Sequence, residues 1–154
     1  MRTASLIVGL AALTTTGLMV APAYAAAGKV DGSVTAVGTT CTWTNATTSN
    51  TPPNTLTVDH TTISASCGGG VTVGLSNSPT VTFNDTAGTA TSPSVGVTAT
   101  VSGLNCGYSV SNLSLARQGT TRTYTGGPFT ASKTSGSFLC PGTATVDSAS
   151  FSFH

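Results

Sequence analysis

Apolar and polar residues alternate along several short segments of the chain beyond its first 25 residues. In the clearest segment, Val or Ala stands at positions 95, 97, 99 and 101, with Gly, Thr or Ser between them. A period of two is typical of a β-strand with one buried face, because successive side chains point to opposite sides of the sheet. The same pattern recurs over 71–75 and 80–83, and Asn77-Ser78-Pro79 between them favours a tight turn.

Further strands are predicted where β-branched and aromatic residues lie between clusters of Gly, Pro, Asn and Asp. They cover 32–37, 40–44, 55–67, 107–116, 120–125, 137–140 and 143–153. Helix signals are nearly absent, since this part of the chain has no Glu and little Leu. About nine short strands, spaced about ten residues apart, predict an all-β, antiparallel, immunoglobulin-like β-sandwich. A closed barrel is the alternative architecture.

The first 25 residues have the three parts of an export signal. Arg2 supplies the positive start, 6–13 an apolar stretch, and Ala23-Tyr24-Ala25 a cleavage site with small residues on either side. The apolar run is interrupted by Thr and Gly at 14–17, so we expect a cleaved signal peptide at 1–25 rather than a transmembrane anchor. Residues 26–154 then form a single domain of a secreted protein.

Composition after Ala25 narrows the function classes. These 129 residues contain 28 Thr, 18 Ser, no Glu, four cationic residues and four Asp. A surface that reads nucleic acid needs a clustered basic excess, which a balanced charge does not supply. We therefore expect no nucleic-acid partner.

Four cysteines follow the predicted signal peptide: Cys41, Cys67, Cys106 and Cys140. An even number of cysteines in an exported chain indicates two disulfides, and the absence of a C-x-x-C spacing disfavours a zinc or redox site. Of the three pairings that four cysteines allow, we favour Cys41 with Cys67 and Cys106 with Cys140. Loops of this length each add about 3–4 kcal/mol of stability in the chain-entropy model.

Residues for catalysis are scarce. His60 and His154 are the histidine bases after Ala25, and the Asp59 that precedes His60 would point to the other face of a strand. The four Asp lie in separate segments, and Asp85 belongs to a turn-like stretch, 84–88. We therefore predict that the protein is not an enzyme, with no catalytic residue, no metal and no cofactor.

Candidate ligand-binding residues come from the aromatic set and from one basic stretch. Trp43, Tyr108 and Tyr124 could stack on a flat ligand in a cleft, and Arg122 could contact it. Arg117, Arg122 and Lys133 lie in a stretch without acidic residues, so one end of the domain could be positive and touch an anionic wall polymer.

Two stretches, 81–90 and 119–129, together with the ending 137–154, resemble small exported proteins of actinobacteria that have no assigned function. The resemblance covers most of the chain from Cys67 onward. It implies a secreted, disulfide-bonded β domain and no particular activity. In size, in Thr, Ala and Gly content and in its two expected disulfides, the chain also resembles chromoprotein apoproteins such as neocarzinostatin, which hold a flat chromophore in a cleft of an immunoglobulin-like sandwich.

The leading interpretation is a secreted, non-catalytic interaction or structural protein of the cell envelope or the extracellular space. Its partner would be a cell-wall polymer or another envelope protein, and the oligomeric state stays open. The alternative is a small-ligand carrier with an aromatic-lined cleft. A carrier predicts a concave apolar pocket next to Trp43 or Tyr124, whereas an interaction protein predicts a packed centre and a flat or edge-strand surface.

Overall fold

The computed structural model describes residues 27–154, so the predicted signal peptide at 1–25 lies outside the described residues. It contains one 3-10 turn, η1 (His60–Thr62), and none of its helical segments is long and apolar enough to cross a membrane. All strand pairings are antiparallel, which confirms the predicted all-β antiparallel class. The strands are β1 (Gly28–Ala36), β2 (Thr39–Thr48), β3 (Leu56–Thr57), β4 (Ser66–Cys67), β5 (Thr72–Leu75), β6 (Thr80–Asn84), β7 (Thr89–Val101), β8 (Leu104–Arg117), β9 (Thr123–Gly126), β10 (Phe129–Gly136) and β11 (Thr143–Phe153).

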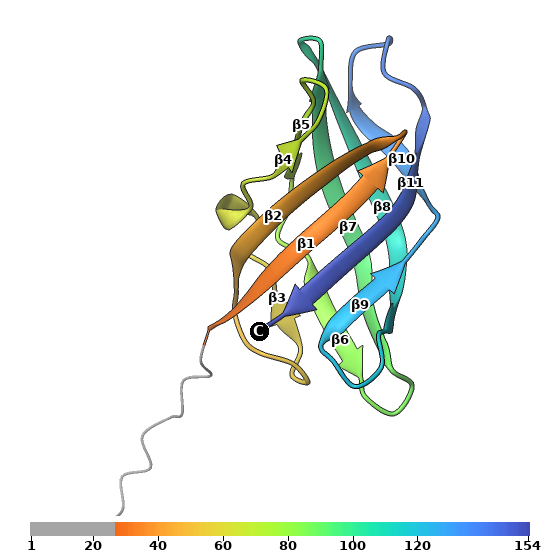
Figure 1. The fold of residues 1–154 in the computed structure, drawn as a ribbon. Coiled ribbons are helices and arrows are strands. Elements are labelled where there is room, and N and C mark those ends of the chain that lie inside the picture. The colour runs from red at the N-terminus through yellow and green to blue at the C-terminus, as the bar shows by residue number, and fades with distance from the viewer. Residues whose placement is uncertain (1–26) are drawn as a thin grey trace, which may run out of the picture.

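The strands belong to one continuous sheet that curls around on itself (Figure 1). Their order is β3-β6-β7-β8-β10-β11-β1-β2-β4, with β5 beside β7, and β9 beside both β8 and β11. The bridge between Thr48 and Val58 joins the end of β2 to the residue after β3, so the pairings return to their start. This completes a ring at the end of the molecule that carries the 85–88 and 118–122 loops, which we call the closed end.

The opposite end is not closed by hydrogen bonds. There β4 pairs with β2 and β5 pairs with β7, while no pairing joins β4 to β5 among the described residues. This open end carries the loops between β1 and β2, β4 and β5, β7 and β8, and β10 and β11. The two separate sheets of an immunoglobulin-like sandwich are therefore not confirmed.

Two predicted strands are wrong and one strand was missed. Most of 55–67 is irregular because Asp59 caps η1, accepting a hydrogen bond from the Thr61 N–H, and this turn interrupts the extended chain. Residues 137–140 form a turn, closed by the Cys140 N–H donating to the Ser137 carbonyl. The missed strand is β10, where Phe129 and Ala131 alternate with polar residues.

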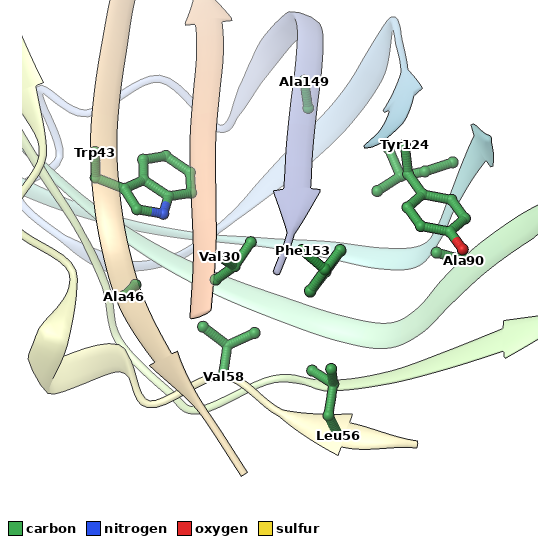
Figure 2. Packing of buried hydrophobic residues seen from close by; sticks show 10 residues of the cluster. Val30, Trp43, Ala46, Leu56, Val58, Ala90, Tyr124, Ala149 and Phe153 are labelled. Carbon is green, nitrogen blue, oxygen red and sulfur yellow. The ribbon is translucent and has the colours of Figure 1, made fainter. Parts of the chain in front are cut away.

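The closed end is filled by a packed core (Figure 2). At its centre, the ring centroids of Phe83 and Tyr124 lie 5.3 Å apart, and Phe83 meets Phe153 edge to face at 5.1 Å. Such tilted aromatic pairs contribute beyond the area that they bury. The fully or nearly fully buried members of this cluster are Val30, Trp43, Ala46, Leu56, Val58, Ala90, Leu115, Tyr124, Ala149 and Phe153.

The two disulfides join Cys41 to Cys67 and Cys106 to Cys140, which confirms the favoured pairing. The first ties β4 to β2, directly across the register of that strand pair. The second ties the β10–β11 loop to β8. Both therefore lie toward the open end, where strand pairing alone leaves the sheet unclosed.

Trp43 of β2 lies over Gly32, its register partner on β1. A Cβ atom at position 32 would overlap the indole ring, so the ring occupies the place that any other side chain would take. Glycine is therefore needed at this strand position for close packing and not for backbone conformation.

We expect Gly32→Ala to destabilise the protein by about 1–3 kcal/mol, because the added methyl group must displace a buried ring. Urea unfolding and the emission spectrum of Trp43, the single tryptophan, measure the effect. Gly74→Ala is the matched control, since Gly74 lies in β5 with open space at its Cβ position and no positive φ. Equal stability of the two variants, with unchanged Trp43 emission, would contradict this account.

Candidate ligand cavity

The sheet encloses a cavity of about 690 Å³ between the packed core and the open end. Alternate residues of β7, including Val97 and Ala99, line it, and their neighbours Thr98 and Thr100 do not. Val73 of β5 and Val34 of β1 also contribute to the lining. The alternation read from the sequence thus places these side chains on the inner face of the sheet.

These inner-face residues are only half-buried, although they point into the molecule. Val34, Val73, Val97 and Ala99 all keep part of their surface accessible, because the space they face is not filled by other side chains. Protein interiors normally have few voids larger than a water molecule. The hollow is therefore a distinct feature of this fold.

No charged side chain belongs to the cavity wall in the described part of the chain. The wall is almost entirely aliphatic and aromatic, with Trp43 and Tyr108 as its residues that combine a ring with a polar group. The indole N–H of Trp43 is buried and has no acceptor among residues 27–154. Cys41 and Cys106, one from each disulfide, also line the wall.

The cavity runs from an aromatic floor to the loops of the open end. Phe151 and Phe153 of β11 belong to the lining on the side of the core. At the other extreme the lining includes Val37, Val101 and Leu139, which are exposed to solvent. The cavity therefore reaches the surface at the open end, where β4 and β5 of the described residues are not paired with each other.

The predicted ligand-binding residues divide into two groups. Trp43 and Tyr108 both line the cavity, so the structure brings them to one site. Tyr124 is 1 % exposed within the core and is not part of the cavity wall, and Arg122 lies on the outside of the closed end. These two residues share a hydrogen bond of 3.2 Å, in which Arg122 Nη1 donates to the Tyr124 hydroxyl.

Arg122 and Arg117 both bind Asp85. The Arg122 guanidinium contacts both carboxylate oxygens, Nη1 at 2.5 Å from Oδ1 and Nη2 at 3.0 Å from Oδ2, and Arg117 Nη1 lies 3.2 Å from Oδ1. The hydrogen bond from Arg122 is the main cause that holds the pKa of Asp85 below its usual range. The same contact raises the pKa of Arg122. The cluster joins the β6–β7 turn to the end of β8 and to the β8–β9 loop.

The three cations of the acid-free stretch do not gather at one end of the domain. Arg117 and Arg122 share the carboxylate of Asp85 at the closed end. Lys133 instead donates to the carbonyls of Ser137 and Cys140 in a loop at the open end. The acid-free stretch of sequence is therefore divided between opposite ends, and its two arginines are paired with an acid that precedes it.

His60 has one neighbour that sequence spacing could not reveal. Its Nδ1 lies 2.9 Å from the Ser78 hydroxyl, and its backbone N–H donates to the same oxygen at 3.3 Å. The Asp59 carboxylate, however, accepts from both the N–H and the hydroxyl of Thr61. A catalytic triad needs an acid that orients the histidine. Asp59 instead caps η1, and the His60–Ser78 contact fastens this turn to the β5–β6 connection.

The cavity-lining residues that sequence reasoning did not identify as a site are the small aliphatic side chains of the wall. Their alternation with polar residues predicts which face of β5 and β7 points inward. No feature of the sequence, however, predicts the width of the space that these faces enclose. Among residues 27–154, no three His, Cys, Asp or Glu side chains gather in a way that could hold a metal ion.

We expect Asp85→Asn to lower the thermal unfolding midpoint at neutral pH, because it removes the charge that both arginines bind. Since the pKa of Asp85 is lowered by folding, its stabilisation is complete above the unfolded-state pKa of about 3.9 and is lost as the pH falls through the lower folded-state pKa. The difference from wild type should therefore shrink in acid, which scanning calorimetry across this pH range measures.

Asp147→Asn is the control for this prediction, because Asp147 is exposed and has no ion pair among the described residues. We expect it to leave the midpoint unchanged at neutral pH. If the Asp85→Asn difference stayed constant down to the most acidic pH, the ion pairs would not be its cause.

Comparison with protein-family models, with curated proteins and with solved structures finds no significant match to this chain. The resemblance to small exported actinobacterial proteins and to chromoprotein apoproteins stays a prediction.

Proposed function

We propose that the protein is a secreted carrier of one apolar, uncharged small molecule, which it holds in the cavity inside the curled sheet. The observation that carries this proposal is the cavity itself, with a volume of about 690 Å³ and an almost wholly apolar wall. Natural sites for small ligands have volumes of roughly 300–1,000 Å³ and are lined mainly by hydrophobic and aromatic residues.

The free-energy cost of an empty apolar cavity supports the proposal that a ligand fills it. The wall of an empty cavity loses the dispersion contacts that a packed core would make. Water is a poor substitute, because a water molecule needs two to four polar partners and an aliphatic wall offers few. An apolar ligand restores these contacts and removes its own surface from water.

The chemistry of the wall supports carriage over catalysis. Proton transfer needs a titratable group within hydrogen-bond reach of the reacting atom. His60 and the four Asp of the described residues are not among the cavity-lining residues. The polar groups of the wall are uncharged: the Tyr108 hydroxyl, the Trp43 indole and the hydroxyls of Thr39, Thr91, Ser92 and Ser102. Such a wall favours recognition by shape and apolar contact.

The alternative of a non-catalytic interaction protein, which led the sequence analysis, predicts a packed centre. The closed end fits that expectation, whereas the half with Val73, Val97 and Ala99 is hollow. We therefore place carriage first. An attachment to a cell-wall polymer or an envelope protein is compatible with carriage and stays open.

Secretion is part of the proposal. The export pattern at 1–25 and two disulfides after it fit a protein that oxidises outside the cytoplasm. A carrier in that compartment would serve to keep a poorly soluble molecule in solution.

We expect the purified protein to bind the uncharged fluorescent probe N-phenyl-1-naphthylamine with saturable 1:1 stoichiometry and to transfer energy from Trp43 to it. Ala99→Phe places a ring inside the cavity and should weaken probe binding by about tenfold or more, because filled space excludes the probe. Fluorescence titration, with urea unfolding to verify folding, measures both.

Thr100→Phe is the matched control, since it adds the same ring to the next residue of β7, which is not part of the cavity wall. It should bind the probe like the wild type. If the folded wild-type protein did not bind the probe, or if Ala99→Phe and Thr100→Phe bound it equally well, ligand carriage in the cavity would be excluded.

We expect the protein recovered from culture fluid to begin at Ala26 and to gain the mass of four hydrogen atoms on reduction, as two disulfides require. Intact-mass measurement with and without reductant gives both values, and native mass spectrometry of the same sample shows any bound molecule. Retention of residues 1–25 in a cytoplasmic protein with free thiols would refute secretion.

A further inference from the structure

Large apolar side chains are exposed at one end of the molecule. Residues 27–154 expose five of them, and all lie in or beside loops of the open end. Phe138 is the most exposed, at 91 %. The set consists of Val37 in the β1–β2 turn, Val101 and Leu104 beside the β7–β8 turn, and Phe138 and Leu139 in the β10–β11 loop. Apolar residues gathered in one region of a surface indicate an interaction site.

The β10–β11 loop is held so that Phe138 faces outward. The disulfide from Cys140 to Cys106 anchors the loop to β8. Lys133 Nζ donates to the carbonyl of Ser137 at 2.7 Å and to that of Cys140 at 3.4 Å, so its amine braces the loop from both sides of Phe138. A bridged and hydrogen-bonded loop does not need an exposed phenylalanine for its own stability.

The loops of the open end are uncharged, which fits contact with the apolar region of a bilayer. The four loops contain no charged residue, and the half-buried Lys133 beneath the β10–β11 loop directs its ammonium group to the carbonyls of that loop. Asp85 lies at the closed end, where two arginines neutralise it. The acidic residue nearest along the chain is Asp147, on β11 beyond the loop.

The mouth of the cavity lies among the same residues. Val37, Val101, Leu104 and Leu139 belong both to the exposed set and to the cavity lining. A path of apolar side chains therefore runs without interruption from the loop tips to the floor of the cavity.

We propose that the open-end loops dock onto the surface of a lipid bilayer, with Phe138 inserted among the acyl chains, and that the cavity takes up its apolar ligand from that bilayer. This inference rests on the proposed carrier function and adds the source of the ligand. A molecule that suits an aliphatic cavity partitions into lipid, so its concentration in water is low and contact with the membrane shortens its path.

A bilayer suits these loops better than a protein partner does. The exposed side chains stand on separate loop tips around an opening, and a folded partner would need a matching hollow for each of them. A fluid acyl-chain phase fits any such arrangement, and insertion of apolar side chains is a general mode of interfacial binding.

The test is flotation of the wild-type protein with vesicles of phosphatidylcholine. We expect binding, and we expect Phe138→Ser to weaken vesicle partitioning by about tenfold or more, because the buried area of one aromatic side chain is lost. Phe138→Trp should keep binding and shift its added emission to shorter wavelength when vesicles are present. Phe138 is exposed in a loop, so both variants should fold like the wild type.

A second variant tests whether the position of the exposed phenylalanine matters, or only its presence on the surface. Phe138→Ser combined with Thr120→Phe moves the exposed ring to the β8–β9 loop of the closed end and keeps the number of exposed phenylalanines. It should bind vesicles as weakly as Phe138→Ser alone. The proposal would be overturned if the wild type did not bind vesicles, or if Phe138→Ser bound them as strongly as the wild type. It would also be overturned if the relocation variant recovered full binding.

Two further outcomes keep this inference separate from the carrier function. Phe138 does not line the cavity, so Phe138→Ser should bind N-phenyl-1-naphthylamine like the wild type. Probe binding without vesicle binding would refute docking alone, whereas a wild type that binds vesicles but no probe would refute carriage. Concentration-dependent dimerisation without lipid, abolished by Phe138→Ser, would assign these loops to a second copy of the chain and overturn docking.

Discussion

Antiparallel hydrogen bonding around the closed end sets how far apart the facing walls of the sheet stand, because the spacing between paired strands hardly varies. The side chains inside must fill the space that this ring encloses. At the closed end Phe83, Tyr124 and Phe153 are large enough to do so. Toward the open end the inner face carries mostly Val and Ala, whose volume falls short, and the cavity is the difference. The same strand spacing therefore gives a packed core where the inner side chains are large and a cavity where they are small.

Period-two alternation was sufficient to predict the all-β antiparallel class and the inner face of β7 over 95–101. It failed where a side chain bonded its own backbone, as Asp59 does at η1, because such a local contact leaves no trace in the apolar pattern. Trp43 and Tyr108 could be proposed as site residues from their chemistry. Tyr124 has the same chemistry, and only the packing around it shows that it belongs to the core. The curl of the sheet, and with it the cavity, depends on long-range pairings such as Val30 of β1 with Phe153 of β11 that sequence spacing does not encode.

The two ends of the molecule differ in the interactions that stabilise them. The closed end combines a continuous hydrogen-bonded ring with aromatic packing and the ion pairs of Asp85. The open end has cross-links in place of a ring, and apolar side chains that meet water. Stability is rarely uniform across a structure, and sites that admit ligands come from its less stable parts.

Both disulfides lie where the sheet lacks closure, and one sulfur of each belongs to the cavity wall. A newly made chain with reduced thiols has the closed end specified by its hydrogen bonds and aromatic contacts, while β4 and the β10–β11 loop lack their anchors. Oxidation therefore does more than add stability, since it completes the container. For the carrier proposed above, this order of events would keep the reduced chain from holding an apolar molecule before export, and the chain would become a receptacle only once its cysteines are oxidised.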